Sequence, residues 1–531
     1  MKKLLLLLIT SFTIISCSET VDAEKIPWTS TSDEAKVLFD KFLNNREIRR
    51  ANPDDQEKLM NSILKLDPNF ALGKINFSWG WPNTTREETR KNLLSAYDDR
   101  ENVSDLEKRL IIANFEAFIN GNGIRFDEIL DSLANDYPQY YQLRLWSGTS
   151  KNDLQNPKAA QKRWEEALEI NPKSFSAYVN LSLLHFQYID GFTLLAPADR
   201  DLEKAISLLQ KGKKEHPNSS RWARFLGNIY RSQAKMDKAE EAYKEAADIV
   251  AKSEDGPESR AYAEMLYLIA HVKTFKGEYD EGRDYYEQSI SWLQNNNVIN
   301  ANGIGQFYAH TYIYQKDFAK AIYYISELQS NLDNFDVDEI VKTNYNIGLE
   351  FTKFLAFGHS QKQEETLASI EKMKSLREFR LKRLLEDAFD ENQKNRLNLS
   401  FEKQTLGNKI WYNILFGKYE EAGDLLLNFK TVSDSQLSYN PNALNDYYKF
   451  SGYLNLMEGN PQESIDSYSN LADEILSDDN YHLYFLALAK KALGQTDESD
   501  KMFNELANNN FATWQNAVVK NLAKSQIKVN I

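Results

Sequence analysis

The sequence predicts an all-α fold, a solenoid superhelix built from stacked helix–turn–helix repeats. One observation is a local pattern in which small side chains mark where two antiparallel helices touch and large ones fill the space beside them. This pattern occupies Ala223, Leu226, Gly227, Tyr230, Ala239, Tyr243 and Ala246, and it recurs with variations along most of the chain. The other observation is composition, because only 12 prolines and 21 glycines accompany many segments rich in Leu, Ala, Lys and Glu.

The length of 531 residues also favours a solenoid. A single hydrophobic core stops growing at about 250–300 residues, whereas each repeat of a solenoid needs only its neighbours. Stacks of this kind usually hold other molecules rather than transform them, so we expect a binding role.

Residues 1–16 are predicted to be a removable lipoprotein signal peptide. Lys2 and Lys3 precede an apolar run, 4–15, that is too short to span a bilayer. The segment ending at Cys17, the only cysteine, resembles the lipobox of bacterial lipoproteins. The resemblance implies a lipid on Cys17 and, because Ser18 follows, transfer to the outer membrane, on a face that stays open. The alternative is a secretory signal with an incidental cysteine.

The charge of the chain narrows the classes of partner. A net charge of −14 and a pI near 5.2 argue against nucleic acid, because phosphate binding needs a basic surface. An acidic surface also repels anionic headgroups, so we assign membrane contact to the lipid on Cys17. With that thiol modified, none remains for a disulfide or a thiolate metal site. We expect neither a cofactor nor a metal.

Repeat boundaries divide the remaining chain. We expect a polar tether over 17–30, an N-terminal array over 31–250 and a C-terminal array with a capping helix over 251–531. Prolines mark where one repeat closes and the next begins, at Pro68, Pro138, Pro172 and Pro217. The small residue that opens each second helix is predicted at Ala160, Ala205, Ala239, Gly282, Ala321, Ala422, Ser464 and Ser499.

The pattern is weakest between Ala321 and Ala422. These residues are 101 positions apart, about three repeat periods, yet only one weak repeat is visible there. The charged stretch 376–398 predicts a long, largely exposed helix or helix pair. The segment 509–528 predicts a terminal helix that covers the last repeat, with four residues on one side: Trp514, Val518, Leu522 and Ile527.

Several segments resemble tetratricopeptide (TPR) repeats, over roughly 153–506. GEYDEGRDYYEQSI from Gly277 and GKYEEAGDLLLNF from Gly417 are typical of the turn and second helix. ILKLDPNFALGKINFSW, nearer the N-terminus, resembles the TPR region of some bacterial signalling regulators. The resemblance implies the repeat scaffold and a protein or peptide partner, and it leaves the ligand unspecified.

The repeat register predicts a ligand groove on the concave side. With Gly227 as position 8, the residues pointing into it are Arg221, Arg224, Asn228 and Arg231, then Tyr267 and His271, then Gln306, His310 and Tyr314. Arginine presents a planar fork to carboxylates, and the rings suit a peptide or a sugar. The alternative is that the arginines pair with acidic residues of adjacent repeats and the rings pack between repeats.

Catalytic motifs are absent from the sequence. None of the six histidines belongs to a His-Glu-x-x-His motif, and neither a Gly-x-Ser-x-Gly elbow nor a phosphate-binding glycine loop is present. We therefore expect no enzyme. An envelope hydrolase would require a cluster of titratable groups in a pocket.

The function that we expect is a lipid-anchored TPR scaffold that binds a protein or peptide in the bacterial cell envelope. The alternative is a glycan-binding outer-membrane lipoprotein of the SusD type, working beside a transporter. FSWGWPNTT from Phe77 is a small aromatic loop suited to sugar. SusD-type proteins generally interrupt their repeats with long loops rich in Gly, Asn and Trp, and the sparse glycine here favours the scaffold.

Overall fold

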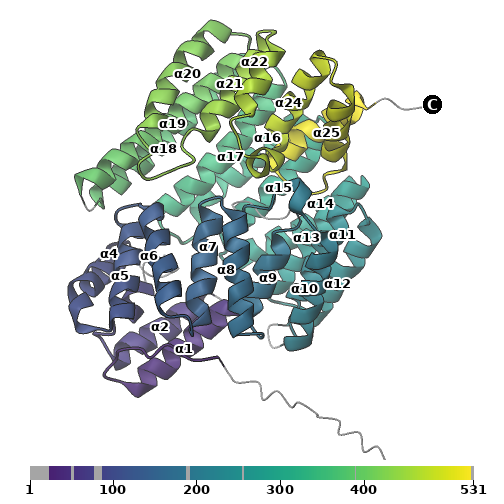
Figure 1. Ribbon diagram of the computed structural model, residues 1–531. Coiled ribbons are helices and arrows are strands. Elements are labelled where there is room, and N and C mark those ends of the chain that lie inside the picture. The colour runs from purple at the N-terminus through teal and green to yellow at the C-terminus, as the bar shows by residue number, and fades with distance from the viewer. Residues whose placement is uncertain are drawn as a thin grey trace, which may run out of the picture.

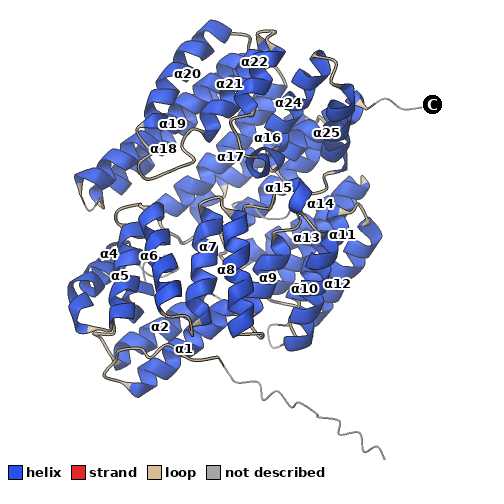
Figure 2. Ribbon diagram, in the orientation of Figure 1, coloured by secondary structure: helices blue, strands red, loops and turns tan. Residues whose placement is uncertain are grey.

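The computed structural model describes residues 23–48, 53–76, 86–186, 192–253, 256–388 and 390–527. Within these ranges the chain forms helices joined by turns, and it contains no strand (Figures 1 and 2). The all-α fold class is therefore confirmed. The signal peptide 1–16, Cys17 and the aromatic loop 77–85 lie outside the described residues.

Consecutive helices pack against each other in antiparallel pairs along the chain. The helices of the first half are α1 (Asp33–Glu47), α2 (Pro53–Leu66), α3 (Ala71–Asn76), α4 (Arg86–Asp98), α5 (Asp105–Phe118), α6 (Gly123–Asp136), α7 (Tyr141–Asp153), α8 (Pro157–Ile170), α9 (Phe175–Leu183), α10 (Leu202–Glu215), α11 (Arg221–Ser232) and α12 (Met236–Ala251). Those of the second half are α13 (Arg260–Lys276), α14 (Tyr279–Asn295), α15 (Ala301–Tyr314), α16 (Phe318–Ser330), α17 (Glu339–His359), α18 (Gln363–Glu386), α19 (Glu391–Leu415), α20 (Tyr419–Asp434), α21 (Asn445–Met457), α22 (Pro461–Tyr468), α23 (Asp473–Ser477), α24 (Asn480–Ala492), α25 (Thr496–Asn508) and α26 (Trp514–Gln526).

The predicted register of the repeats is confirmed. All four marker prolines lie in turns between helices, for example Pro217 between α10 and α11. All eight small residues lie on the second helix of a pair and are buried. A Cβ on Gly227 would lie 2.5 Å from Cε1 of Tyr243, so glycine is what lets α11 and α12 approach this closely.

The folded body begins before residue 31. Ile26 and Trp28 are buried, and Trp28 Nε1 donates a hydrogen bond to Asp40 Oδ1 on α1 at 3.0 Å. The backbone N–H of Thr29 donates to Glu107 Oε1 on α5 at 2.7 Å. The tether expected over 17–30 is therefore shorter, because two apolar side chains hold its second half against the first repeats.

The interval between Ala321 and Ala422 contains two steps of the repeat rather than three. Ala321 lies on α16 and Ala422 on α20, and only the pair α17–α18 precedes the pair α19–α20. The additional residues lengthen the helices, since α17, α18 and α19 contain 21, 24 and 25 residues. The charged stretch 376–398 is the tip of the α18–α19 hairpin, so the expected helix pair is present (Figure 1).

The superhelix curves until the two halves of the chain touch. At the turn between α5 and α6, Arg396 Nη2 of α19 donates to the carbonyl oxygen of Ile119 at 3.2 Å. Before α10, Arg200 Nη2 lies 3.1 Å from Asp478 Oδ1, just after α23. Figure 1 shows the purple and blue helices α1 to α8 beneath the green helices α18 to α22. The solenoid is therefore a closed coil.

The C-terminal helix α26 packs on two parts of this coil. All four residues predicted to face the last repeats contact their core, so the expected cap is present. On another face of α26, Ala517 packs with Tyr314 of α15, and Asn521 Nδ2 donates to the carbonyl oxygen of Tyr314 at 2.7 Å. The helix thus caps the last repeat and also bridges to the middle of the chain.

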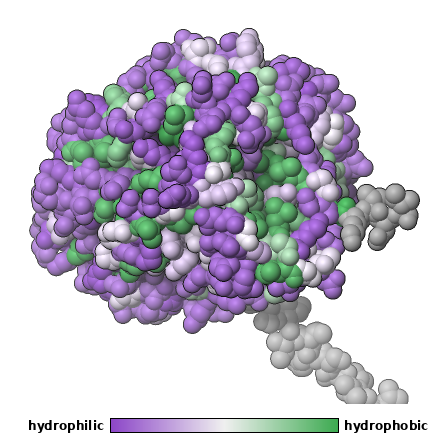
Figure 3. Space-filling view, turned by 90° about the horizontal axis from the view of Figure 1, so that it is seen from above, coloured by the Kyte–Doolittle hydropathy of each residue, from purple (hydrophilic) through white to green (hydrophobic). Residues whose placement is uncertain are grey.

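The face seen from above in Figure 3 is mostly hydrophilic, with groups of hydrophobic residues between the hydrophilic ones. Across the described part of the chain, we find no helix with both the length and the apolar character that a bilayer crossing requires.

Candidate functional site

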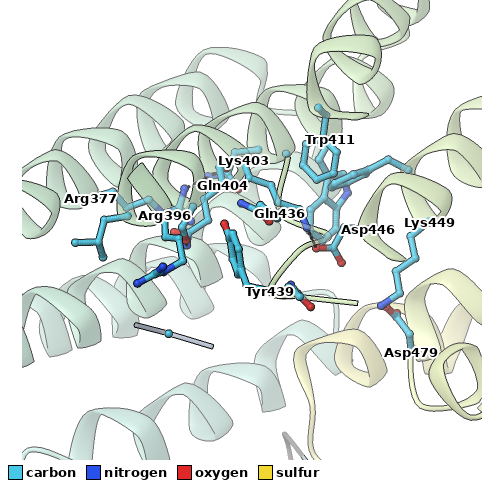
Figure 4. A pocket seen from close by; sticks show the side chains of 18 of the residues that line it. Arg377, Arg396, Lys403, Gln404, Trp411, Gln436, Tyr439, Asp446, Lys449 and Asp479 are labelled. Carbon is cyan, nitrogen blue, oxygen red and sulfur yellow. Dashed lines mark hydrogen bonds and ion pairs between the residues drawn. The ribbon is translucent and has the colours of Figure 1, made fainter. Parts of the chain in front are cut away.

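The second half of the coil contains a cavity of about 660 Å³ (Figure 4). Residues of α18 and α19 form one end, and residues of α21 and α24 form the other. The α20–α21 connection and the α5–α6 turn contribute to its sides. Ligand pockets in proteins typically measure about 300–1,000 Å³, so the cavity has the size of a binding site.

Aromatic side chains from three helices form one wall of the cavity. The ring of Trp411 on α19 lies 5.3 Å from that of Trp514 on α26 and 6.5 Å from that of Phe450 on α21. Trp411 Nε1 donates to the hydroxyl of Tyr481 at 3.0 Å, which fixes the orientation of the indole. These rings offer a rigid apolar surface to a ligand.

Amide and hydroxyl groups line the middle of the cavity. Gln404 Nε2 donates to Ser400 Oγ at 3.1 Å, and Gln404 Oε1 accepts from Arg380 Nη2 at 3.1 Å. Gln436 and Asn440 come from the α20–α21 connection. Amide side chains carry both donors and acceptors, so they match the N–H and C=O groups of a peptide backbone.

Two ion pairs neutralise the α21–α24 end. Lys449 Nζ lies 2.9 Å from Asp479 Oδ2, and Lys403 Nζ lies 3.4 Å from Asp446 Oδ2. Burial raises the pKa of Asp479, but the Lys449 ammonium more than offsets this and the pKa is lowered to about 2. Burial lowers the pKa of His482 to about 4, so this ring is neutral at pH 7. The end therefore carries balanced charge.

Two arginines lie at the opposite end (Figure 4). Arg377 of α18 is only 9% exposed, and its Nε has no hydrogen-bond partner among the residues that the structure describes. Arg396 of α19 lies against Gly121, where an added Cβ would be 3.0 Å from Nε. Gly121 has a φ of +56°, so glycine serves both the turn and the close approach of the guanidinium.

The groove predicted from the sequence lies elsewhere, on α11, α13 and α15. Arg221 and Arg224 are partly exposed at its outer end. Arg224 Nη2 donates to the hydroxyl of Tyr267 at 3.4 Å, and Nη1 lies 3.9 Å from Glu264 Oε2. Arg224 thus has the acidic neighbour in the next repeat that the alternative interpretation expects.

Further along the same groove, the chain's own C-terminal segment packs on the predicted residue Arg231. Arg231 is buried, donates to the carbonyl oxygen of Asn510 and lies 4.8 Å from the ring centre of Phe511. Asn228 is buried as well, and its Oδ1 accepts from the hydroxyl of Tyr243.

Of the predicted rings of α13 and α15, Tyr267 is partly exposed, whereas His271, His310 and Tyr314 are buried. His271 Nδ1 bonds to the hydroxyl of Tyr286, while both ring nitrogens of His310 and the hydroxyl of Tyr314 have no partner in the described chain. Burial lowers the pKa of His310 to about 4. The structure brings the predicted groove residues together, and a partner-binding role for them stays a prediction.

The sequence pattern does not predict the cavity, because its lining extends from the α5–α6 turn to α26 and the repeat signal fades in α17–α19. One local signal is present in the sequence. Arg377, Arg380 and Arg383 recur every three residues, and Arg396 follows on the next helix of an otherwise acidic chain.

In the residues that the structure describes, no group of three or more His, Cys, Asp or Glu side chains is placed to hold a metal ion.

A family model described as a tetratricopeptide repeat matches residues 225–249 and 263–296, which lie on α11 to α14. This is the region in which the small and large packing residues follow the repeat spacing most closely. No curated protein matches the sequence.

Solved helical-repeat structures are similar to parts of the chain. A tetratricopeptide repeat protein from Parabacteroides merdae is 14% identical, with 55% of this chain and 96% of that chain covered and a TM-score of 0.35. The apo form of RapI is 12% identical, covering 58% and 99%, with a TM-score of 0.35. A Rap protein complexed with competence and sporulation factor is 11% identical, covering 77% and 100%, with a TM-score of 0.39. Similarities of this size do not identify a ligand.

Proposed function

Since the chain is a tetratricopeptide-repeat protein, we propose that it is a protein-interaction scaffold that holds a short extended segment of its partner in the cavity between α18–α19 and α21–α24. The observation that carries this proposal is the lining of the cavity. A rigid aromatic wall, a row of amides, two arginines at one end and two ion pairs at the other are arranged along one concavity.

An extended peptide has the chemistry that this lining would recognise. It presents backbone donors and acceptors at regular intervals, with side chains alternating to either side. The amides of Gln404 and Gln436 would form hydrogen bonds with the peptide backbone. The rings of Trp411 and Phe450 offer a surface for an apolar side chain. The closed coil limits the length of chain that enters, which favours a short segment over a folded domain.

The proposal includes no reaction. Repeat folds of this type generally act as scaffolds rather than catalysts. The one histidine in the cavity lining, His482, is neutral, and its Nδ1 bonds to the hydroxyl of Tyr468 at 3.3 Å.

A blocking variant tests the role of the cavity. Ser400 is an exposed cavity residue on α19, and Ser400→Trp fills the space without removing a charge. Asn398→Trp, two residues earlier and outside the cavity lining, is the matched control. The full chain would be captured from solubilised envelopes after photo-crosslinking, and its fold checked by circular dichroism. The partner should be lost with S400W and kept with N398W. Equal capture by both variants would contradict the proposal.

The location in the cell is a second part of the proposal. We propose that the scaffold is lipid-anchored in the bacterial cell envelope, at the outer membrane, and the support is the lipobox-like segment ending at Cys17. Metabolic labelling with an alkyne palmitate analogue should mark the wild-type chain, and Cys17→Ser should abolish the label. An unlabelled wild-type chain would exclude the anchor and leave the cavity proposal intact.

A further inference from the structure

We propose that the α18–α19 end of the cavity is a carboxylate-binding subsite, in which the guanidinium groups of Arg377 and Arg396 and the hydroxyl of Tyr439 hold one carboxylate of the bound peptide. This inference rests on the proposed function, because it names the chemistry of the segment that the cavity accepts.

The first observation is that these two cations have no carboxylate partner among the described residues. Neither Arg377 nor Arg396 forms an ion pair with any residue in the described part of the chain. Arg377 Nη1 reaches only the carbonyl oxygen of Gln404, at the long distance of 3.5 Å, and its Nε is unbonded. Arg396 uses one nitrogen, Nη2, for the carbonyl oxygen of Ile119. Several N–H donors of both groups are therefore available.

The second observation is the burial of Arg377, whereas Arg396 is partly exposed. Burial, and then the neighbouring Arg380, lower the pKa of Arg377 to about 10, so the side chain keeps its charge at neutral pH. A buried charge without a counter-charge destabilises a fold, and proteins usually pair such groups or place them where a ligand pairs them. Among the described residues no such pairing group faces Arg377, so a ligand is the remaining source of the counter-charge.

The third observation is a buried donor between the two arginines and the aromatic wall. The hydroxyl of Tyr439 is buried and has no hydrogen-bond partner in the described part of the chain. Burial raises the pKa of this hydroxyl, so it stays protonated and can donate. The guanidinium carbon of Arg396 lies 5.7 Å from the centre of the Tyr439 ring, which places the two groups on the same side of the cavity. Figure 4 shows Tyr439 next to Arg396.

The distribution of charge along the cavity determines the orientation in which the peptide would bind. Of the four cations that line the cavity, Lys403 and Lys449 are paired with Asp446 and Asp479 at the other end. The uncompensated positive charge is therefore confined to the α18–α19 end. Guanidinium groups bind carboxylates through parallel N–H···O bonds, so an anionic group of the peptide would lie here and its uncharged part along Trp411.

A small-molecule titration tests the subsite without requiring that a peptide binds. The full chain with ¹⁵N-labelled arginine would be titrated with N-acetylglycine, a terminal carboxylate, and with N-acetylglutamic α-amide, a side-chain carboxylate. The Nε–H signals of Arg377 and Arg396, assigned from the variants R377Q and R396Q, should shift with at least one probe. The neutral N-acetylglutamine amide should shift neither signal. Absence of shifts with both acids, or an equal response to inorganic phosphate, would overturn the inference.

A peptide measurement then links the subsite to the scaffold role. Fluorescein-labelled pentapeptides would be compared in pairs that differ only by Asp or Glu against Asn or Gln, or by a free against an amidated C-terminus. The acid member should bind more tightly, and R377Q, R396Q or both should weaken it by about 10- to 100-fold. Tyr439→Phe should weaken it less. Arg383→Gln is the control, since Arg383 lies on the same helix, outside the cavity, in an exposed pair with Glu386.

The outcomes separate the two proposals. If no pentapeptide binds the wild type while the arginine signals respond to the small acids, the peptide scaffold fails and the subsite stands. If peptides bind but acid and amide members bind equally, the scaffold stands and the subsite fails.

Discussion

Arg231 and Asn510 are 279 positions apart, and the guanidinium of Arg231 donates two hydrogen bonds, of 3.2 and 2.9 Å, to the carbonyl oxygen of Asn510. The same guanidinium donates to the hydroxyl of Tyr243 at 3.3 Å. A side chain predicted to meet a partner therefore holds the chain's own C-terminal segment. This contact joins α11 to the segment that leads into α26.

Arg231→Gln should destabilise the protein. The change leaves the carbonyl oxygen of Asn510 without its charged donor in a buried place, so we expect a loss of about 2–3 kcal/mol in the free energy of unfolding. Urea unfolding followed by circular dichroism measures it. Lys211→Gln, on the exposed face of α10, removes the same charge and should change the value by less than about 0.5 kcal/mol. Equal losses in the two variants would show that the contact between Arg231 and Asn510 does not add to the free energy of unfolding.

Gly227→Ala should destabilise the fold, although alanine favours helices. The new methyl would lie 2.5 Å from Tyr243 Cε1, so the helix pair must separate, at a cost of about 1–3 kcal/mol. Gly423→Ala on α20 is the control, because no atom of the described residues lies within 4 Å of the added Cβ. There we expect a gain of up to about 1 kcal/mol from helix propensity. A gain in both variants would disprove the close contact of α11 and α12.

The protein should lose stability as the pH falls from 6.5 towards 4. Burial lowers the pKa of His310 to about 4, so between these values the unfolded chain binds a proton that the folded chain does not. From pH 7 to pH 5 this residue alone should reduce the free energy of unfolding by about 2 kcal/mol. His310→Leu should remove that part of the pH dependence. The check is the difference between variant and wild type at both pH values, and a constant difference would contradict the prediction.

Arg200→Met should weaken the contact between the two halves. Arg200 donates to Asp478 Oδ1 and to Ser477 Oγ, and burial raises the pKa of Asp478 to about 6 although Arg200 opposes this shift. Because the pair is partly exposed, the single change should cost about 2 kcal/mol, less than for a fully buried pair. The double variant with Asp478→Leu should recover most of the loss. A double-mutant cycle without coupling would exclude the pair as a stabilising contact.

Local spacing was sufficient to predict the repeats but not their closure. Small residues such as Ala239 and Ser499 predict where helices touch, because that contact is made within one pair. The burial of Arg231 depends on a segment near Asn510, and no local pattern encodes a contact over such a distance. The cavity was not predicted because Arg377 and Arg396 lie on helices lengthened beyond the repeat, where the count of positions no longer applies.

The contact between the two halves affects how the protein unfolds and is digested by proteases. In an open array the terminal repeats loosen first, and a protease or a pulling force starts there. Here the turn at Ile119 is held by α19, and the loop at Arg200 is held by the residues after α23. Each half thus shields the other's weak points, and we expect digestion to begin only after the whole molecule has opened at once.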